Sequence, residues 1–365
     1  MSEIYIGLMS GTSVDAVDAV AVSFSEASSE TIGSASVAID ADLRSAILDL
    51  CGPGMNEIEK AQYVENRIAV LYAEAVGKLL AELSLKPADI RALGAHGQTV
   101  RHRPEAGATT QLINGALLAE LTGIDTIVDF RSRDIAAGGQ GAPLVPAFHR
   151  AWFESSHPVA LLNIGGIANV TVVPTAGSGE ALIGFDTGPG NMLMDAWIEK
   201  HLRRRFDEGG RWAAKGEVIA PMLDEMLREP YFARPLPKST GRELFNLGWL
   251  QNYLTGEERA EDVQRTLLEL TAVSIAAALR SLGGGIRELY VCGGGSQNPL
   301  LMERIRQRLP ELTVGVTDDR GLATQDVEGA AFAWLAKAFV DRICGNDPSV
   351  TGASGPRILG CLYPA

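Results

Sequence analysis

The stretch ALIGFDTGPGN, residues Ala181–Asn191, combines the features from which a fold and a candidate site can be inferred. Its apolar first half is typical of a buried β-strand, which delivers Asp186 into a turn over Thr187–Gly190. Asn191 then stands where it would cap a helix. Open α/β proteins place chemistry on carboxylates at strand ends beside helix N-termini. An aspartate that only hydrogen-bonds its own turn also fits, and the local pattern leaves both interpretations open.

The composition indicates a soluble globular protein of two domains. The chain has 365 residues, of which 46% are hydrophobic and 21% charged. A net charge of −13 disfavours a nucleic-acid partner but not a small anionic ligand. The sequence shows neither a membrane-spanning run nor a signal peptide, so we expect a cytoplasmic protein. Its four cysteines lack CxxC spacing, which favours neither a zinc site nor disulfides.

Two segments predict β-hairpins with glycine-containing tips. In the first, strands Ile4–Leu8 and Ala16–Phe24 flank a tip whose small, hydroxyl-bearing residues could hold a phosphate, although a plain polar turn fits as well. In the second, strands Val159–Ile164 and Val170–Val173 flank Gly165–Gly166. The recurrence of this form after about 155 residues predicts two similarly folded domains, over 1–150 and 151–365. A helical insertion is expected over about 203–262, and the last helix could pack back on the first domain.

Further candidate residues follow predicted strands. Arg131 comes after the strand Thr126–Phe130 and before the glycine-rich run Gly138–Pro143. Arginines in such places can clamp a carboxylate or phosphate through forked donors, although most surface arginines do not. Gln98 and Thr99 follow the strand Ile90–Ala95.

A third glycine-rich turn, GGGSQNP over Gly293–Pro299, connects a strand to a helix and would admit a nucleotide against bare backbone. Close helix–strand packing is the alternative reason for its glycines. A dinucleotide fingerprint is rejected because Asn298 takes the place of its third glycine. A P-loop in PKSTGRE is rejected because no glycines precede Lys238. Glu328 stands in the first turn of an alanine-rich helix, on a face that ought to be buried.

In this order, the motifs resemble those of the anhydro-N-acetylmuramic acid kinase family, within the superfamily of sugar kinases, actin and heat-shock chaperones. The motifs that carry the resemblance are GLMSGTSVDAVD (Gly7–Asp18), GAHGQTVRH (Gly94–His102), DFRSRDIAAGGQGAPLVPAFH (Asp129–His149), LNIGGIANV (Leu162–Val170), GFDTGPGN (Gly184–Asn191), PKSTGRE (237–243), VCGGGSQN (Val291–Asn298) and EGAAFAWLA (Glu328–Ala336). The resemblance implies two actin-like, ribonuclease H-like α/β domains, each with a mixed sheet, and ATP in the cleft between them.

The resemblance also implies an activity. ATP and water would open 1,6-anhydro-N-acetylmuramic acid and phosphorylate its oxygen 6, giving N-acetylmuramic acid 6-phosphate and ADP during peptidoglycan recycling. Mg²⁺ and a homodimer are implied as well. The metal ligands stay open. The chain reads Gly7, Leu8, Met9 where the wider superfamily usually has an aspartate early in the first phosphate hairpin, and Asn163 where an acid is common in the second, which leaves Asp186, Asp15 or water to hold the metal.

The site roles follow from matching this chemistry to the motifs. Oxygen 6 is tied up in the anhydro bridge, so a general base must activate water at carbon 1, and we assign Asp186 to that step. Glu328 is expected to hydrogen-bond the substrate or the water, Arg131 the lactyl carboxylate, and Gln98 and Thr99 the substrate. The ATP-binding candidates are Gly11, Thr12, Ser13, Val14, Asp15, Ala16, Val17, Asp18, Gly165, Gly166, Gly293, Gly294 and Gly295.

Two alternatives remain. A kinase for a neutral anhydro-sugar such as levoglucosan would gain if Arg131 faced solvent. An ATP-driven switch or chaperone-like binder on the same fold would turn over ATP irrespective of anhydro-sugars, and would give Asp186 and Glu328 no shared pocket.

Overall fold

The computed structural model describes residues 2–11, 14–25, 28–236, 238–283 and 285–365. It divides into two compact units. The first comprises Met1–Trp152 and Arg320–Ala365, and the second Phe153–Asp319. The end of the chain therefore belongs to the first unit and not to the second domain over 151–365, which agrees with the expectation that the last helix could pack back on the first domain.

The first unit is built on a six-stranded mixed sheet in the order β13-β7-β4-β1-β2-β3. Its strands are β1 (Glu3–Ser10), β2 (Ala16–Phe24), β3 (Ser29–Ala38), β4 (Ile90–Ala95), β7 (Thr126–Val128) and β13 (Cys361–Tyr363), and a separate ribbon pairs β5 (Gln98–Arg103) with β6 (Ala108–Leu112). The helices are α1 (Ala41–Leu50), α2 (Glu57–Leu83), α3 (Gly115–Thr122), α4 (Ser132–Ala136), α5 (Val145–Trp152), α11 (Val327–Val340) and α12 (Pro348–Thr351), with 3-10 turns η1 (Pro87–Asp89) and η2 (Pro104–Ala106).

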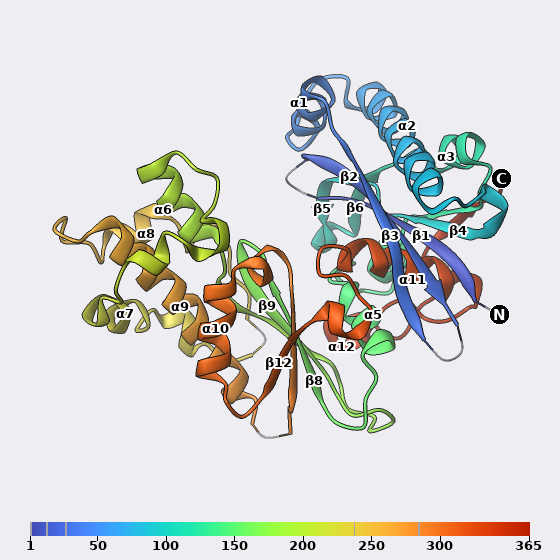
Figure 1. Ribbon diagram of the computed structural model, residues 1–365. Helices are drawn as coiled ribbons and strands as arrows, with labels where there is room; N and C mark the ends of the chain where they lie inside the picture. Colours follow the sequence, from blue (N-terminus) through green and yellow to red (C-terminus); the bar gives the residue numbers. More distant parts are fainter. Residues whose placement is uncertain (1, 12–13, 26–27, 237, 284) are drawn as a thin grey trace. The chain divides into compact units, whose positions relative to one another are not determined.

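Alternation along β1 places helices on both faces of this sheet. Ile6 and Leu8 lie in one apolar core with residues of α1 and α2. On the opposite face Gly7, which pairs with Gly94 of β4, lies against α11. A Cβ on Gly7 would lie 1.8 Å from the Gly329 carbonyl oxygen, so glycine is what allows α11 to approach. This close contact explains why α11 belongs to the first unit (Figure 1).

The second unit repeats the same strand order in a five-stranded sheet, β10-β9-β8-β11-β12. In each sheet three antiparallel strands are followed by two strands that add in parallel beyond the first of them, which confirms the predicted mixed α/β fold with one mixed sheet per domain. The strands are β8 (Val159–Ile164), β9 (Ile167–Val173), β10 (Ile183–Pro189), β11 (Glu288–Cys292) and β12 (Thr313–Val316). The helices are α6 (Met192–Leu202), α7 (Ala220–Met226), α8 (Leu247–Gln251), α9 (Ala260–Ser281) and α10 (Pro299–Arg308), with 3-10 turns η3 (Glu208–Gly210), η4 (Ala213–Lys215), η5 (Pro230–Ala233), η6 (Gly294–Gln297) and η7 (Thr317–Arg320).

One apolar core fills the second unit. Inward residues of β8, such as Leu162, pack with the long helix α9 and with α10. The predicted helical insertion takes the form of short helices, of which α7 and α8 contribute Met226 and Leu250 to the same core. None of the helices in the described ranges is long and apolar enough to cross a membrane.

Candidate functional site

Asp186 lies in the middle of β10, which continues through Thr187 to Pro189. The predicted turn over these residues is therefore wrong. β10 is the edge strand beside β9, and an edge strand tolerates proline because one side of its backbone needs no partner. The pairing with β9 shifts between Asp186 and Gly188, so that Thr187 forms a β-bulge. Bulges re-aim side chains and are frequent beside active sites.

The half-buried Asp186 carboxylate is bound by protein on one side. Its Oδ2 accepts a hydrogen bond of 3.0 Å from the Thr240 amide. Burial raises the pKa of Asp186; the Thr240 hydrogen bond lowers it, and the charge of Glu243 raises it further. A carboxylate with a raised pKa and one oxygen not engaged by Thr240 has the properties of a general base.

The predicted glycine tip of the second hairpin joins the segment that follows Asp186. Amides of Gly190 and Met192 donate to the Gly166 carbonyl at 2.8 and 3.1 Å, and the Asn191 amide donates to Gly165 at 2.8 Å. Asn191 occupies the N-cap position of α6, but its side chain donates to the Ile164 carbonyl instead of capping the helix. The tip glycines have room around them, since a Cβ on Gly166 would meet its nearest neighbour at 3.7 Å.

The triple glycine divides into two kinds of position. A Cβ on Gly293 would lie 2.3 Å from Asn163 Oδ1, and one on Gly295 would lie 2.3 Å from Ile164 Cγ2. Close packing against β8 therefore requires these two glycines. Gly294 is exposed, with Asn191 Nδ2 the nearest atom at 3.8 Å from its added Cβ. The second unit thus brings the glycine tip, the triple glycine and the segment after Asp186 together.

In the first unit, the hairpin tip contains Thr12 and Ser13, which lie outside the described residues. The Gly11 carbonyl accepts a hydrogen bond of 3.4 Å from Gln98 Nε2. The other predicted ATP-binding residues are placed differently. Val14 and Val17 point into the apolar core, Ala16 begins β2 half-buried, Asp15 is exposed 3.9 Å from Arg44, and Asp18 is exposed. The side chains of Val14 and Val17 are therefore unavailable to a ligand.

Arg131 stands just before α4, and two uncharged acceptors hold its guanidinium. Nε and one terminal nitrogen donate to His96 Nε2 at 3.1 and 2.8 Å, and the other terminal nitrogen donates to the Gly141 carbonyl at 2.7 Å. Burial and the neighbouring Arg131 charge lower the pKa of His96 to about 3. The imidazole is therefore neutral, and it carries its proton on Nδ1 because Nε2 accepts.

Asp134 fixes the loop that carries Gly141. It is fully buried, and its carboxylate accepts from the Gly141 amide at 2.8 Å, from Asn346 at 2.6 Å and from Thr351 at 2.7 Å. Asp134 therefore holds in place the loop whose Gly141 carbonyl accepts a hydrogen bond from Arg131. His96 and Asp134 stand within the motifs quoted above, but their contacts join segments far apart in sequence, which no local pattern predicts.

Glu328 lies in the first turn of α11, in the same unit as Arg131. Glu328 is exposed, so the expectation that it lies on a buried face is wrong. Nearby protein atoms still desolvate its carboxyl and raise its pKa. The charge of Arg131 opposes that shift and the charge of Asp18 adds to it, so these three groups lie within electrostatic reach. Gln98 is buried with Oε1 unpartnered among the described residues, whereas Thr99 Oγ1 accepts from Gln111 at 3.2 Å. The first unit therefore gathers Arg131, Glu328 and Asp18, and separately Gln98 beside Gly11.

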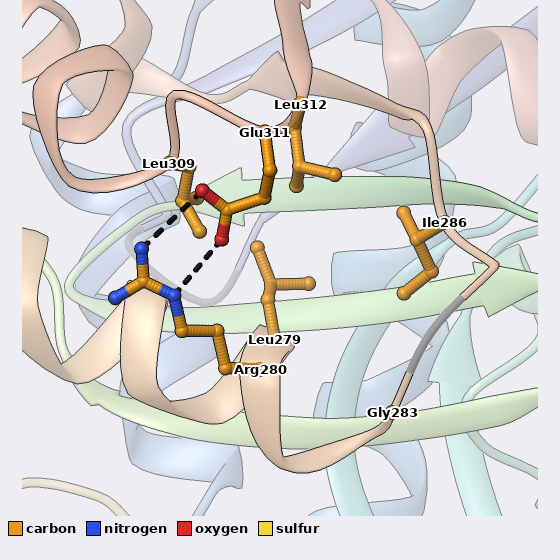
Figure 2. A pocket seen from close by; sticks show the side chains of 7 residues that line it. All are labelled: Leu279, Arg280, Gly283, Ile286, Leu309, Glu311 and Leu312. Atoms are coloured by element: carbon orange, nitrogen blue, oxygen red, sulfur yellow. Dashed lines mark hydrogen bonds and ion pairs between the residues drawn. The ribbon is translucent and has the colours of Figure 1, made fainter.

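A pocket of the second unit contains none of the predicted site residues. Figure 2 shows it between the ends of α9 and α10, with an apolar floor that includes Leu279 and Leu309, and with Arg280 paired to Glu311 at 2.9 Å. Within the described ranges no group of three or more His, Cys, Asp or Glu side chains could hold a metal ion.

Comparison with known proteins places these residues in a family. Residues 3–365 match the model of the anhydro-N-acetylmuramic acid kinase family. Relatives with that name include proteins of Nitrosomonas europaea (50% identical over 365 residues, 99% of each chain) and Pseudomonas paraeruginosa (51% over 364 residues, 99% of each chain). Another, from Variovorax paradoxus, is 50% identical over 372 residues, covering 100% of this chain and 99% of its own.

Proposed function

The chain belongs to the anhydro-N-acetylmuramic acid kinase family and is a kinase, and we propose that it uses ATP and water to open 1,6-anhydro-N-acetylmuramic acid and phosphorylate oxygen 6. The products are N-acetylmuramic acid 6-phosphate and ADP, and the reaction serves peptidoglycan recycling. A cytoplasmic homodimer is part of the same proposal.

The observation that carries the proposed chemistry is the environment of Asp186. A simple sugar kinase activates the acceptor hydroxyl, whereas here oxygen 6 is bonded to carbon 1 and water must be activated instead. Asp186 has a raised pKa and one carboxylate oxygen that Thr240 does not engage, which supports its role as the base for that water. Water enters opposite the departing oxygen, as in inverting glycosidases, and the γ-phosphoryl group of ATP is transferred to oxygen 6.

Arg131 is proposed to bind the lactyl carboxylate. Its guanidinium is half-buried and held by neutral acceptors, so an anionic ligand would meet a positioned charge that neither acceptor neutralises. A solvent-facing Arg131 would favour a levoglucosan kinase, whereas the half-buried position of Arg131 supports the muramic substrate. Glu328 is proposed to hydrogen-bond the sugar or the water, and Gln98 Oε1 is available for a ligand donor.

The phosphates of ATP are proposed to bind at the backbone of Gly11 and of Gly165–Gly166, and the adenosine beside Gly293–Gly295. Mg²⁺ is proposed to arrive with the nucleotide, since it is usually held by substrate phosphates and one or two carboxylates, and no larger acidic cluster exists in the described part. When bound, the ion would neutralise phosphate charge.

The test is an assay of ADP release and of phosphorylated product with three additions: the muramic anhydro-sugar, levoglucosan, or no sugar. We expect turnover with the first only. Equal ATP turnover in all three reactions would contradict the proposal and favour an ATP-driven switch.

A further inference from the structure

The segment 238–243, rejected above as a P-loop, lies against Asp186. The Asp186 amide donates to the Lys238 carbonyl at 3.1 Å, and the Thr240 amide donates back to Asp186 Oδ2 at 3.0 Å. Tyr231 binds the same residue, because its hydroxyl donates to the Asp186 carbonyl at 2.7 Å. Backbone and carboxylate of Asp186 are thus bound by residues from outside its own sheet.

The segment is itself anchored to the core. Lys238 Nζ donates to the Phe232 carbonyl at 2.9 Å and lies 5.0 Å from the centre of the Tyr231 ring. Tyr231 is fully buried and packs edge-on against Phe245, with ring centres 5.7 Å apart. Because Lys238 is held at both its side chain and its carbonyl, the Thr240 amide has a defined position relative to Asp186.

We propose that Lys238 and Thr240 are positioning residues for Asp186: the Thr240 amide occupies Oδ2, the Lys238 carbonyl holds the Asp186 amide, and Oδ1 is left as the atom that takes the proton. This proposal rests on the proposed role of Asp186 as the base. In the step, Oδ1 accepts a proton from water while the water oxygen bonds to carbon 1. The electron pair of the broken C1–O6 bond stays on oxygen 6, which bonds to the γ-phosphorus as ADP leaves.

The charges around Asp186 give the arrangement a measurable signature. A hydrogen bond to a carboxylate stabilises its ionised form, so the Thr240 amide holds the pKa of Asp186 below the value that burial alone would set. The charge of Glu243 acts in the opposite direction. Two titratable groups that bind the Asp186 backbone also face it: Tyr231, which burial keeps neutral, and Lys238, whose pKa burial lowers.

The test compares variants that keep or remove the Thr240 N–H. Thr240→Pro removes it and should raise the pKa of Asp186 by about one unit. Thr240→Val keeps it and should leave that pKa unchanged, since the Thr240 hydroxyl has no partner among the described residues. Glu243→Gln should lower it. The pKa is read from carboxyl ¹³C NMR of the resting protein, with the Asp186 signal identified by its loss in Asp186→Asn.

In the pH profile of kcat/KM, the acidic limb should move in the same direction as the pKa of Asp186 measured by NMR. Thr240→Pro should lower kcat by about 10- to 10²-fold and leave the KM for ATP unchanged. The exposed neighbour variant Ser239→Ala serves as the activity control. Should Thr240→Pro not fold, Lys238→Met should give the same upward shift, smaller in size. An unmoved Asp186 titration in a folded variant overturns the positioning role. The positioning role is also overturned if the pKa of Asp186 moves while the acidic limb of the kcat/KM profile stays in place. The proposed function fails separately, if the wild-type protein is inactive on the anhydro-sugar, and that outcome leaves the NMR result unaffected.

Discussion

Replacing Arg131 by alanine should separate charged from neutral substrates. The guanidinium donates to His96 and to the Gly141 carbonyl, and no ion pair joins it to a carboxylate within the described ranges. A carboxylate ligand would therefore complete a half-buried, charge-assisted pair. Truncating one partner of such a pair costs about 2–5 kcal/mol, and about 3 kcal/mol corresponds to a loss of about 10²-fold in kcat/KM.

The assay measures kcat/KM of wild type and variant with 1,6-anhydro-N-acetylmuramic acid and with the corresponding sugar that lacks the lactyl acid. We expect the 10²-fold loss, mainly through KM, for the acid and less than about 10-fold for the neutral sugar. Arg133→Ala is the matched control, because Arg133 is exposed and lies two residues along the chain. The melting temperature of Arg131→Ala, measured beside that of the wild type, shows whether the variant is folded. Equal losses for both sugars would refute the assignment of Arg131 to the carboxylate.

Three further predictions concern the base and the second unit. Asp186→Asn should keep the fold and ATP binding but lower turnover by about 10²–10⁴-fold, and near-normal turnover would exclude it as the base. In the wild-type protein, buried Glu269 is bound by Arg304 at 2.7 Å and by Arg308 at 2.6 Å. Replacing both arginines by methionine leaves this carboxylate charged and unpaired, so the unfolding free energy in urea titrations should fall by about 3–5 kcal/mol. Adding Glu269→Met should recover most of the lost unfolding free energy, and no recovery would contradict the reasoning. Burial and a neighbouring aspartate raise the pKa of Asp195 to about 6, above its unfolded value, so the stability this group contributes is present at low pH and lost as the pH rises through about 6. Asp195→Asn should therefore raise the unfolding free energy by about 1–2 kcal/mol at pH 8, after reduction for solvent screening. It should have almost no effect at about pH 3, below the unfolded pKa. Equal effects at both pH values would contradict the prediction.

Local sequence chemistry predicts the two hairpins and the repeated mixed sheet well, because alternating apolar strands around glycine tips have few other solutions. It fails at Thr187–Pro189, where threonine, glycine and proline are typical of a turn. Pairing with β9 overrides that preference and keeps the segment in an edge strand with a bulge at Thr187. The position of α11 depends on Gly7 meeting Gly329, a contact between opposite ends of the chain.

The candidate site shows the same limit. Asp186, Arg131 and Glu328 are identifiable from their motifs, but the groups that hold them are not. His96 lies 35 residues before Arg131, and Thr240 lies 54 residues after Asp186. These partners are recognisable only from the fold, since a backbone amide or a neutral imidazole carries no special pattern in sequence.

The central claim is that water, activated by Asp186, attacks carbon 1 while oxygen 6 becomes phosphorylated. The decisive measurement is mass spectrometry of the product formed in oxygen-18 water, with rapid borohydride reduction to stop exchange at carbon 1. One labelled oxygen on carbon 1 and none in the phosphate ester is the predicted result. An unlabelled sugar, or label within the transferred phosphoryl group, would contradict it.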